Sequence, residues 1–134
     1  MPKPIFHLAL VDDWQRAVDQ KKTYYPPTYK TDGFTHATAE PARLLDVANH
    51  FYADTTGDWL CLRMTEESLA AEGIAIEYES AAPVGEADGK IEGTKDVLFP
   101  HIQGGIPVSS VIATHAVLRD RKGRFLDIDL CVEI

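Results

Sequence analysis

Residues 126–134 carry the sequence feature that most constrains the fold, because every second residue there is apolar. Acidic residues occupy three of the intervening positions, so the segment from Leu126 to Ile134 predicts a strand that buries one face and exposes the other. Asp120 to Gly123 shortly precedes it and predicts a hairpin turn that pairs this strand with residues 108–119. The resulting antiparallel pair, in a chain whose predicted strands outnumber its helices, indicates an α+β fold.

The rest of the sequence predicts about six strands in mixed or antiparallel sheets, with two to three helices. Strand-like segments occur at residues 5–11, 59–64, 74–79 and 97–102, and a short extended piece at residues 34–38. Apolar residues at helical spacing predict a helix over residues 14–20, which Asp12 or Asp13 can cap. Thr65 can cap a short helical turn that ends at residue 70 or 71.

The best helix of the chain is expected to follow Thr38, which can serve as its N-cap. Glu40 and Pro41 then fall in the first turn, where acidic residues and proline are both favoured. The core-facing stripe of this helix would consist of Leu44, Val47, Ala48 and Phe51. The arrangement would place His36 next to a helix N-terminus, where N–H groups bind carboxyl or phosphate oxygens. An equally good interpretation is a histidine that bonds to a neighbouring loop.

Length and composition predict one cytoplasmic domain that spans residues 1–134. The formal net charge of −8 argues against non-specific nucleic-acid binding, because phosphate contacts need clustered lysine and arginine. No stretch approaches the roughly 18 apolar residues that cross a membrane, and the N-terminus lacks the apolar run of a signal peptide. Cys61 and Cys131 show no CxxC spacing, which favours buried free thiols. Residues 80–96, rich in glycine and acids, predict a long surface loop.

Ionisable residues that stand among apolar neighbours predict a shared polar site. They are His7, His36, Glu79 and His101. Burying such a group is costly unless it is hydrogen-bonded or paired. Taken singly, a strand histidine is more often structural than catalytic, and Glu77 shares a face with Glu79, so that face can simply be solvated. No HxxxH, HxH or HExxH spacing is present, so no metal ligand is predicted.

The order and spacing of these motifs resemble the bacterial family known as domain of unknown function 952. The resemblance runs from Ile5 to about Val117, whereas the loop at 80–96 and the C-terminal hairpin over 108–134 look like additions. The matching segments are Ile5-Phe6-His7 followed by Trp14, Tyr25-Pro26, Gly33-Phe34-Thr35-His36-Ala37-Thr38, Val47-Ala48-Asn49-His50-Phe51-Tyr52, Ile76-Glu77-Tyr78-Glu79 and Phe99-Pro100-His101-Ile102. Departures from the family pattern are Ala37-Thr38, where cysteine and serine are common, and Gln103-Gly104-Gly105, which replaces the usual Tyr-Gly-Pro.

The family pattern is similar to the ADP-ribosyltransferase-like fold, which implies a split-sheet arrangement and a pocket for NAD or another nucleotide. The resemblance implies that His7, His101 and Thr38 contact the ligand and that His36 and Glu79 are catalytic. Glu79 would orient the ribose hydroxyls while an oxocarbenium-like transition state forms, in transfer of ADP-ribose from NAD or a related phosphate-release step. Because a fold-level analogy does not carry function by itself, a non-catalytic ligand-binding or protein-interaction domain is the competing hypothesis. The substrate and the oligomeric state are left open.

Overall fold

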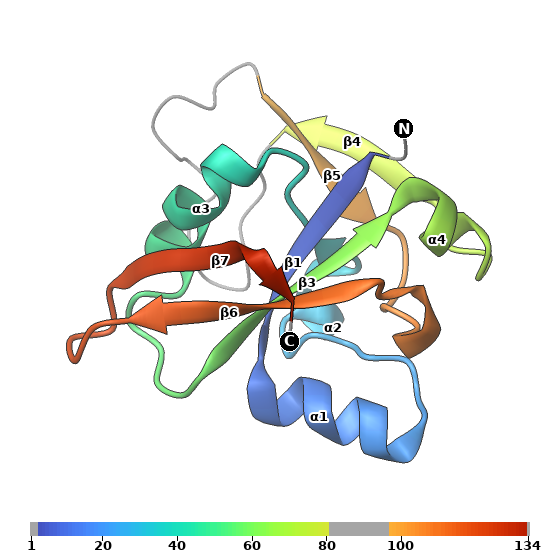
Figure 1. Cartoon of the computed structure of the whole chain (residues 1–134). Helices are drawn as coiled ribbons and strands as arrows, with labels where there is room; N and C mark the ends of the chain where they lie inside the picture. The colour runs from blue at the N-terminus through green and yellow to red at the C-terminus, as the bar shows by residue number, and fades with distance from the viewer. Residues whose placement is uncertain (1–2, 81–96, 134) are drawn as a thin grey trace.

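The alternating apolar segments form antiparallel sheets in the computed structural model, which describes residues 3–80 and 97–133 (Figure 1). One sheet has the order β1-β3-β6-β7, built from Pro4–Leu10, Trp59–Thr65, Ala113–Arg119 and Phe125–Glu133. The other has the order β2-β5-β4, built from Thr35–His36, Leu98–Ile102 and Ile76–Ser80. Every strand pairing in this described part is antiparallel, which confirms the predicted α+β class.

Short helices connect these strands. They are α1 (Val11–Gln20), α2 (Tyr29–Asp32), α3 (Leu44–Phe51) and α4 (Glu66–Ala70), with 3-10 turns η1 (Pro41–Arg43) and η2 (Val108–Ser110). The predicted cap at Thr65 is confirmed, because its hydroxyl accepts from the Ser68 N–H at 2.9 Å. The predicted cap at Asp12 or Asp13 is wrong. Helix α1 begins at Val11, so both carboxylates lie in its first turn, where they complement the helix dipole instead.

Thr38 is not the N-cap of α3, so that prediction is also wrong. Its backbone N–H and C=O are both taken by Phe6, with N···O distances of 2.8 Å in each direction. The chain then starts the 3-10 turn η1 after Glu40, and α3 begins only at Leu44. His36 therefore does not lie beside a helix N-terminus, and the anion site expected there is absent from this part of the described chain. The Phe6–Thr38 bridge instead joins the edge of β1 to the segment that follows β2.

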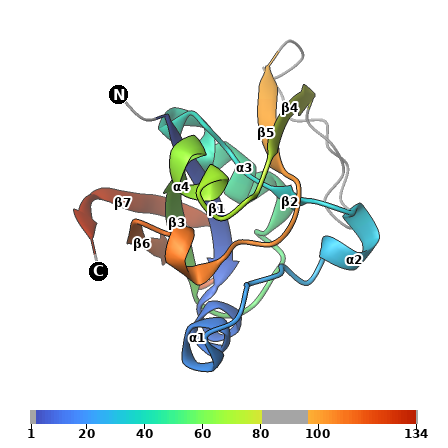
Figure 2. The same cartoon turned by 90° about the vertical axis from the view of Figure 1, so that its right-hand side faces the viewer.

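The four-stranded sheet carries apolar clusters on both of its faces. Ile5 of β1 lies in the cluster that includes Trp14 of α1 and Ile102 of β5. Phe6, which points to the opposite face, lies in the cluster with Leu44 of α3 and with residues of β7. Helix α3 packs against β7, and Figure 2 shows the three-stranded sheet beside the four-stranded one rather than continuous with it. Because both of its faces are buried, β1 is held in place, and the position of His7 on this strand is held with it.

The strict alternation predicted for the last strand is broken near its start. Phe125 and Ile128 are buried, whereas Leu126 is 47% exposed. The register passes from Leu118 opposite Asp127 to Arg119 opposite Phe125, so Leu126 is an extra residue in β7. The extra residue has no partner on β6 and Phe125 takes the core-facing position before it, which is why Leu126 does not enter the core as predicted.

The predictions for the thiols, the loop and the membrane have different outcomes. Cys61 is a free, buried thiol as predicted, and burial raises its pKa to about 12. The side chain of Cys131 and nearly all of the 80–96 loop lie outside the described residues. Among the helices that are described, none has the length and apolar character needed to cross a bilayer.

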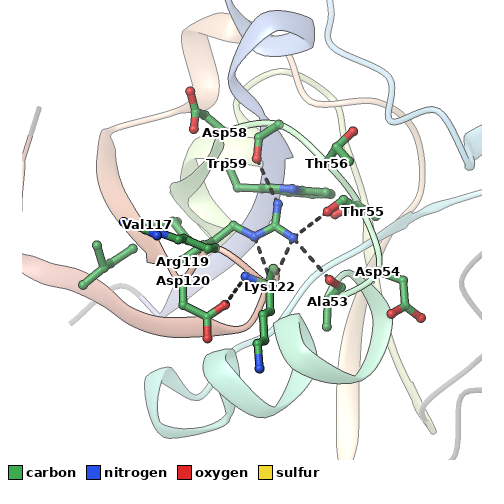
Figure 3. Close-up of a pocket in the computed structure, with 14 residues that line it drawn as sticks. Ala53, Asp54, Thr55, Thr56, Asp58, Trp59, Val117, Arg119, Asp120 and Lys122 are labelled. Carbon is green, nitrogen blue, oxygen red and sulfur yellow. Dashed lines mark hydrogen bonds between the residues drawn. The ribbon is translucent and has the colours of Figure 1, made fainter.

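Arg119 fastens the β6–β7 hairpin to the segment after α3 (Figure 3). Its guanidinium donates to the carbonyls of Thr55 at 2.7 Å, Gly57 at 2.9 Å and Gly123 at 3.0 Å. The same group lies 4.4 Å from the ring centre of Phe125. A groove of about 650 Å³ surrounds it, lined by residues 53–59 and 117–123. Because backbone carbonyls occupy the donors, we interpret Arg119 as a structural clamp rather than a ligand-binding group.

Replacing Arg119 with lysine should lower the free energy of unfolding by about 2–3 kcal/mol, because one ammonium group cannot reach all of these carbonyls. Urea unfolding followed by circular dichroism measures the effect. The matched control is Arg121→Lys, at an exposed position in the same hairpin turn, which should change stability by less than about 0.5 kcal/mol. Equal effects of the two substitutions would contradict the structural clamp.

Candidate functional site

The antiparallel register of the three-stranded sheet brings three of the predicted site residues together. His36 of β2 lies directly opposite His101 of β5, and their ring centres are 5.7 Å apart. Glu79 of β4 lies diagonally across from His101, and its Oε1 is 3.0 Å from the histidine Nδ1. His101 is 3% exposed, whereas the Glu79 side chain is 53% exposed. The sheet therefore presents a carboxylate at its surface that is connected to a buried imidazole.

His36 has a carboxylate partner of its own that the sequence analysis did not identify. The Nε2 of His36 lies 2.9 Å from Oδ2 of Asp32, and both side chains are largely buried. Phe34 stacks on His101 with a ring separation of 4.2 Å and an interplanar angle of 23°. We call Asp32, Phe34, His36, Glu79 and His101 the histidine cluster. It contains two imidazole–carboxylate pairs, which is an arrangement suited to moving protons.

His7 joins this cluster from the other sheet. Its Nδ1 lies 2.5 Å from the backbone oxygen of His36, and its side chain is almost fully buried. A carbonyl oxygen can only accept, so Nδ1 carries the proton. Burial is the largest cause that lowers the pKa of His7, to about 4, with the bond to His36 acting in the opposite direction. His7 is thus a neutral imidazole at pH 7 with Nε2 as an acceptor.

His36 is also shifted towards the neutral form. Burial lowers the pKa of His36, although the hydrogen bond and the charge of Asp32 oppose this shift. The nearby His101 lowers the pKa further. A neutral imidazole has an unprotonated ring nitrogen, which a general base requires, and the Asp32 carboxylate supports proton uptake by that ring.

A cavity of about 260 Å³ adjoins His7. It lies at the edge of β1, since it is lined by His7 and also by Leu8, which points to the opposite face of the sheet. Aromatic walls come from Tyr24, Tyr52 and Trp59. The Tyr52 and Trp59 ring centres are 4.5 Å apart. None of these aromatic residues is among the predicted site residues, so the sequence did not indicate this cavity.

Tyr24 is held in the cavity wall by its backbone. Its N–H and C=O bond to Ile106 at 2.9 and 2.8 Å. A Cβ at Gly105 would lie 2.7 Å from the Tyr24 carbonyl oxygen, so only glycine allows this close approach. Burial is the largest cause that raises the pKa values of Tyr24 and Tyr52, so both hydroxyls are protonated.

Four of the five predicted site residues therefore meet in one cluster, which hydrogen bonds and ring contacts hold together. His7, His36, Glu79 and His101 are connected through the contacts above, and the fifth, Thr38, is buried next to them through its bridge with Phe6. Their roles as catalytic or ligand-binding groups stay predictions. The sequence analysis did not identify Asp32 and Phe34 as members of the site. The available signal was weak, because Gly33 between them takes a φ of +80° and only the folded chain shows how the backbone turns there.

Sequence comparison settles the family. A profile described as "Protein of unknown function (DUF952)" matches residues 9–114. The chain belongs to the DUF952 family. The matched region contains His36, Glu79 and His101, whereas His7 lies two residues before it. No curated protein matches this DUF952 chain.

Solved structures share the fold of this DUF952 domain. The crystal structure of protein CC0527 from Caulobacter crescentus superimposes with a TM-score of 0.68 at 18% identity and covers 92% of this chain and 93% of that chain. The crystal structure of a double mutant of CC0527 gives 0.67 with the same identity and coverage. The solution NMR structure of CC0527 gives 0.58 at 17% identity, with 90% of each chain covered. At this identity the likeness shows the fold alone.

The lowered pKa of His7 predicts a specific loss of stability in acid. The unfolded chain takes up a proton at His7 below its ordinary pKa of 6.5, whereas the folded chain resists until about pH 4. The unfolded state therefore binds more protons in this window, so stability present above pH 6.5 is lost as the pH falls towards 4, by up to about 3 kcal/mol. Urea unfolding at pH 7 and pH 4.5 measures this loss.

The control is His7→Asn, which keeps a donor for the His36 carbonyl and cannot titrate. The difference in unfolding free energy between wild type and this variant should shrink, or change sign, between pH 7 and pH 4.5. A difference that stays constant with pH would show that His7 is not a buried neutral imidazole.

Proposed function

We propose that this domain binds NAD or a related nucleotide at the histidine cluster and, in its catalytic form, transfers the ADP-ribosyl group. The observation that carries the proposal is the convergence of His7, His36, His101 and Glu79, with two carboxylate-paired imidazoles in one group. An active site needs polar groups that converge beside a cavity, and structural histidines scattered over the fold would not meet this requirement.

The proposed chemistry assigns one task to each group. The bond between the ribose C1′ and the nicotinamide nitrogen breaks, and its electron pair leaves with nicotinamide. An acceptor hydroxyl, or water, forms the new bond to C1′ and gives its proton to the neutral His36 imidazole. Glu79, whose carboxylate is half exposed, holds the ribose hydroxyls while positive charge develops at C1′. His7, His101 and Thr38 contact the ligand.

Two observations favour the competing function, a binding domain without turnover. The formal net charge is −8, and Arg43 is paired with Glu40 at 2.9 Å. Arg63 lies on β3 with its Nε buried. A ligand with fewer phosphates than NAD, or none, is therefore the alternative occupant of the same cluster.

Titration of the ¹⁵N-labelled protein with NAD tests the binding step. We expect saturable amide shifts that centre on His7, His36, Glu79 and His101, and we expect His36→Ala to weaken binding at least about tenfold. The folded state of the variant is checked from the dispersion of its own spectrum. Without saturable shifts at millimolar NAD, the proposal of NAD as the ligand fails.

Release of nicotinamide from NAD tests the catalytic step. Glu79→Gln should lower the rate at least about 100-fold and leave the NAD dissociation constant within about threefold, because the carboxylate acts mainly in the transition state. The matched control is Glu77→Gln, an exposed glutamate two residues earlier on the same face of β4, which should leave the rate unchanged. Binding without any nicotinamide release would favour the non-catalytic function.

A further inference from the structure

The three-stranded sheet ends at β4, whose backbone presents hydrogen-bonding groups on its outer side. Gln103, just after β5, donates its backbone N–H to the carbonyl of Ala75 at 2.8 Å. Because hydrogen-bonded pairs alternate along an antiparallel ladder, residues 75, 77 and 79 bond towards β5. The backbone N–H and C=O groups of the intervening residues therefore point away from β5. These residues are Ile76, Tyr78 and Ser80.

These outward groups of β4 have no backbone partner among the described residues. The two edges of the four-stranded sheet differ in this respect. On β1, Thr38 takes both backbone groups of Phe6, and on β7 the side-chain amide of Asn49 takes both backbone groups of Phe125. All of β4 after Ile76 is exposed, and Figure 2 shows β4 and β5 extending away from the four-stranded sheet. The edge at β4 can therefore accept another strand.

The side chains along this edge are acidic. Glu77 and Glu79 project from one face of β4, and both are exposed. On the other face, the hydroxyl of Tyr78 donates to the carboxylate of Glu66 on α4. Neither β4 nor β5 contains a lysine or arginine. A strand added at this edge meets negative charge without a compensating cation on these two strands, so a basic segment is complementary to it.

A second copy of β4 is a poor occupant of the edge. If two copies paired antiparallel about Tyr78, Glu77 of each copy would lie opposite Glu79 of the other. Like charges directly opposite each other are destabilising, and charged side chains on an edge strand commonly prevent such self-pairing. The same charges that exclude a second copy attract an extended segment of opposite charge.

We propose that β4 binds an extended basic segment of a partner protein, which joins the three-stranded sheet as a further antiparallel strand. Two basic residues separated by one residue lie opposite Glu77 and Glu79, because alternate side chains of a strand share a face. The residue between them lies opposite Tyr78 and exchanges two backbone hydrogen bonds with it. The inference does not depend on a nucleotide, although the added strand runs beside the histidine cluster at Glu79.

The first probe is the capped heptapeptide Thr-Val-Lys-Val-Lys-Val-Thr, whose lysines fit opposite the two glutamates of β4. In ¹⁵N spectra we expect saturable amide shifts at residues 76–80, with a dissociation constant of about 0.2–2 mM that weakens as the ionic strength rises. The matched peptide with glutamate in place of both lysines should bind at least about tenfold more weakly. Equal affinity for the two peptides, or no saturable shift at about 10 mM of the lysine peptide, would overturn the inference.

N-methylated peptides separate the addition of a strand from charge attraction alone. Methylation of the second and third valine amides removes N–H groups that bond to β4, whereas methylation of the two lysine amides removes N–H groups that point to solvent. We expect the first change to weaken binding at least about tenfold and the second to leave the affinity within about threefold. Equal losses from the two changes would contradict the added strand.

A charge reversal tests the position of the site. Glu77→Lys should weaken binding of the lysine peptide at least about fivefold and strengthen binding of the glutamate peptide. The control is Asp127→Lys, at an exposed position on β7, which changes the net charge equally and should alter neither affinity by more than about twofold. Equal effects of the two reversals would show attraction to the net charge alone and would overturn the site. If Glu77→Lys does not fold, the methylated peptides decide the question on the wild type.

The results also separate this inference from the proposed function, because the peptide titrations contain no NAD. If the lysine peptide binds as described and NAD does not bind, the docking strand stands and the nucleotide proposal fails. If NAD shifts the histidine cluster and the peptide causes no shift at residues 76–80, the opposite holds. Shifts at residues 76–80 that depend on protein concentration without peptide would show a second copy at this edge and would overturn the inference.

Discussion

The hydrogen bond from Nδ1 of His7 to the backbone oxygen of His36 is the interaction on which the site depends. It spans the two sheets next to the Phe6–Thr38 bridge, so strand pairing on each side fixes both partners. It also determines the tautomer of His7, because the proton must lie on the nitrogen that faces the carbonyl. One contact thereby sets the orientation, the charge and the remaining hydrogen-bonding capacity of a buried imidazole between the histidine cluster and the cavity.

The two carboxylates of the histidine cluster occupy different environments, which gives them different tasks. Asp32 is buried against His36, so it orients that imidazole and opposes the loss of its basicity on burial. Glu79 is half exposed, so its bond to His101 contributes little to stability. An exposed carboxylate is free to exchange its partner for a ligand hydroxyl. This division matches an orienting role for Asp32 and a ligand-facing role for Glu79.

Local sequence patterns predicted features that depend on nearby residues better than features that depend on distant parts of the chain. The α+β class, the 120–123 turn and the Thr65 cap depend on residues close together in the chain, and the structure confirms them. The Thr38 cap failed because a strand more than thirty residues away takes its backbone groups. The face assigned to Leu126 failed because a single extra residue in β7 inverts the alternation.

The same contrast holds for the candidate site, where the sequence predicted individual residues but not the residues they contact. The position of His7, His36 and His101 among apolar residues predicted that each would need a partner once buried, and the structure gives each one a hydrogen-bond partner. Strand register and loop conformation determine which residues become their partners, and the sequence alone does not reveal either. Trp59 was not predicted to line a cavity because an aromatic residue in a buried strand usually indicates core, and only the folded chain shows which residues surround the cavity.

The most direct test of this account is the protonation state of His7, observed through the ¹⁵N shifts of its ring nitrogens across a pH titration. The account predicts a protonated Nδ1 and an unprotonated Nε2 at pH 7, with no uptake of a second proton until the pH approaches 4. A His7 ring that titrates near pH 6.5, or that carries its proton on Nε2, would contradict the central hydrogen bond.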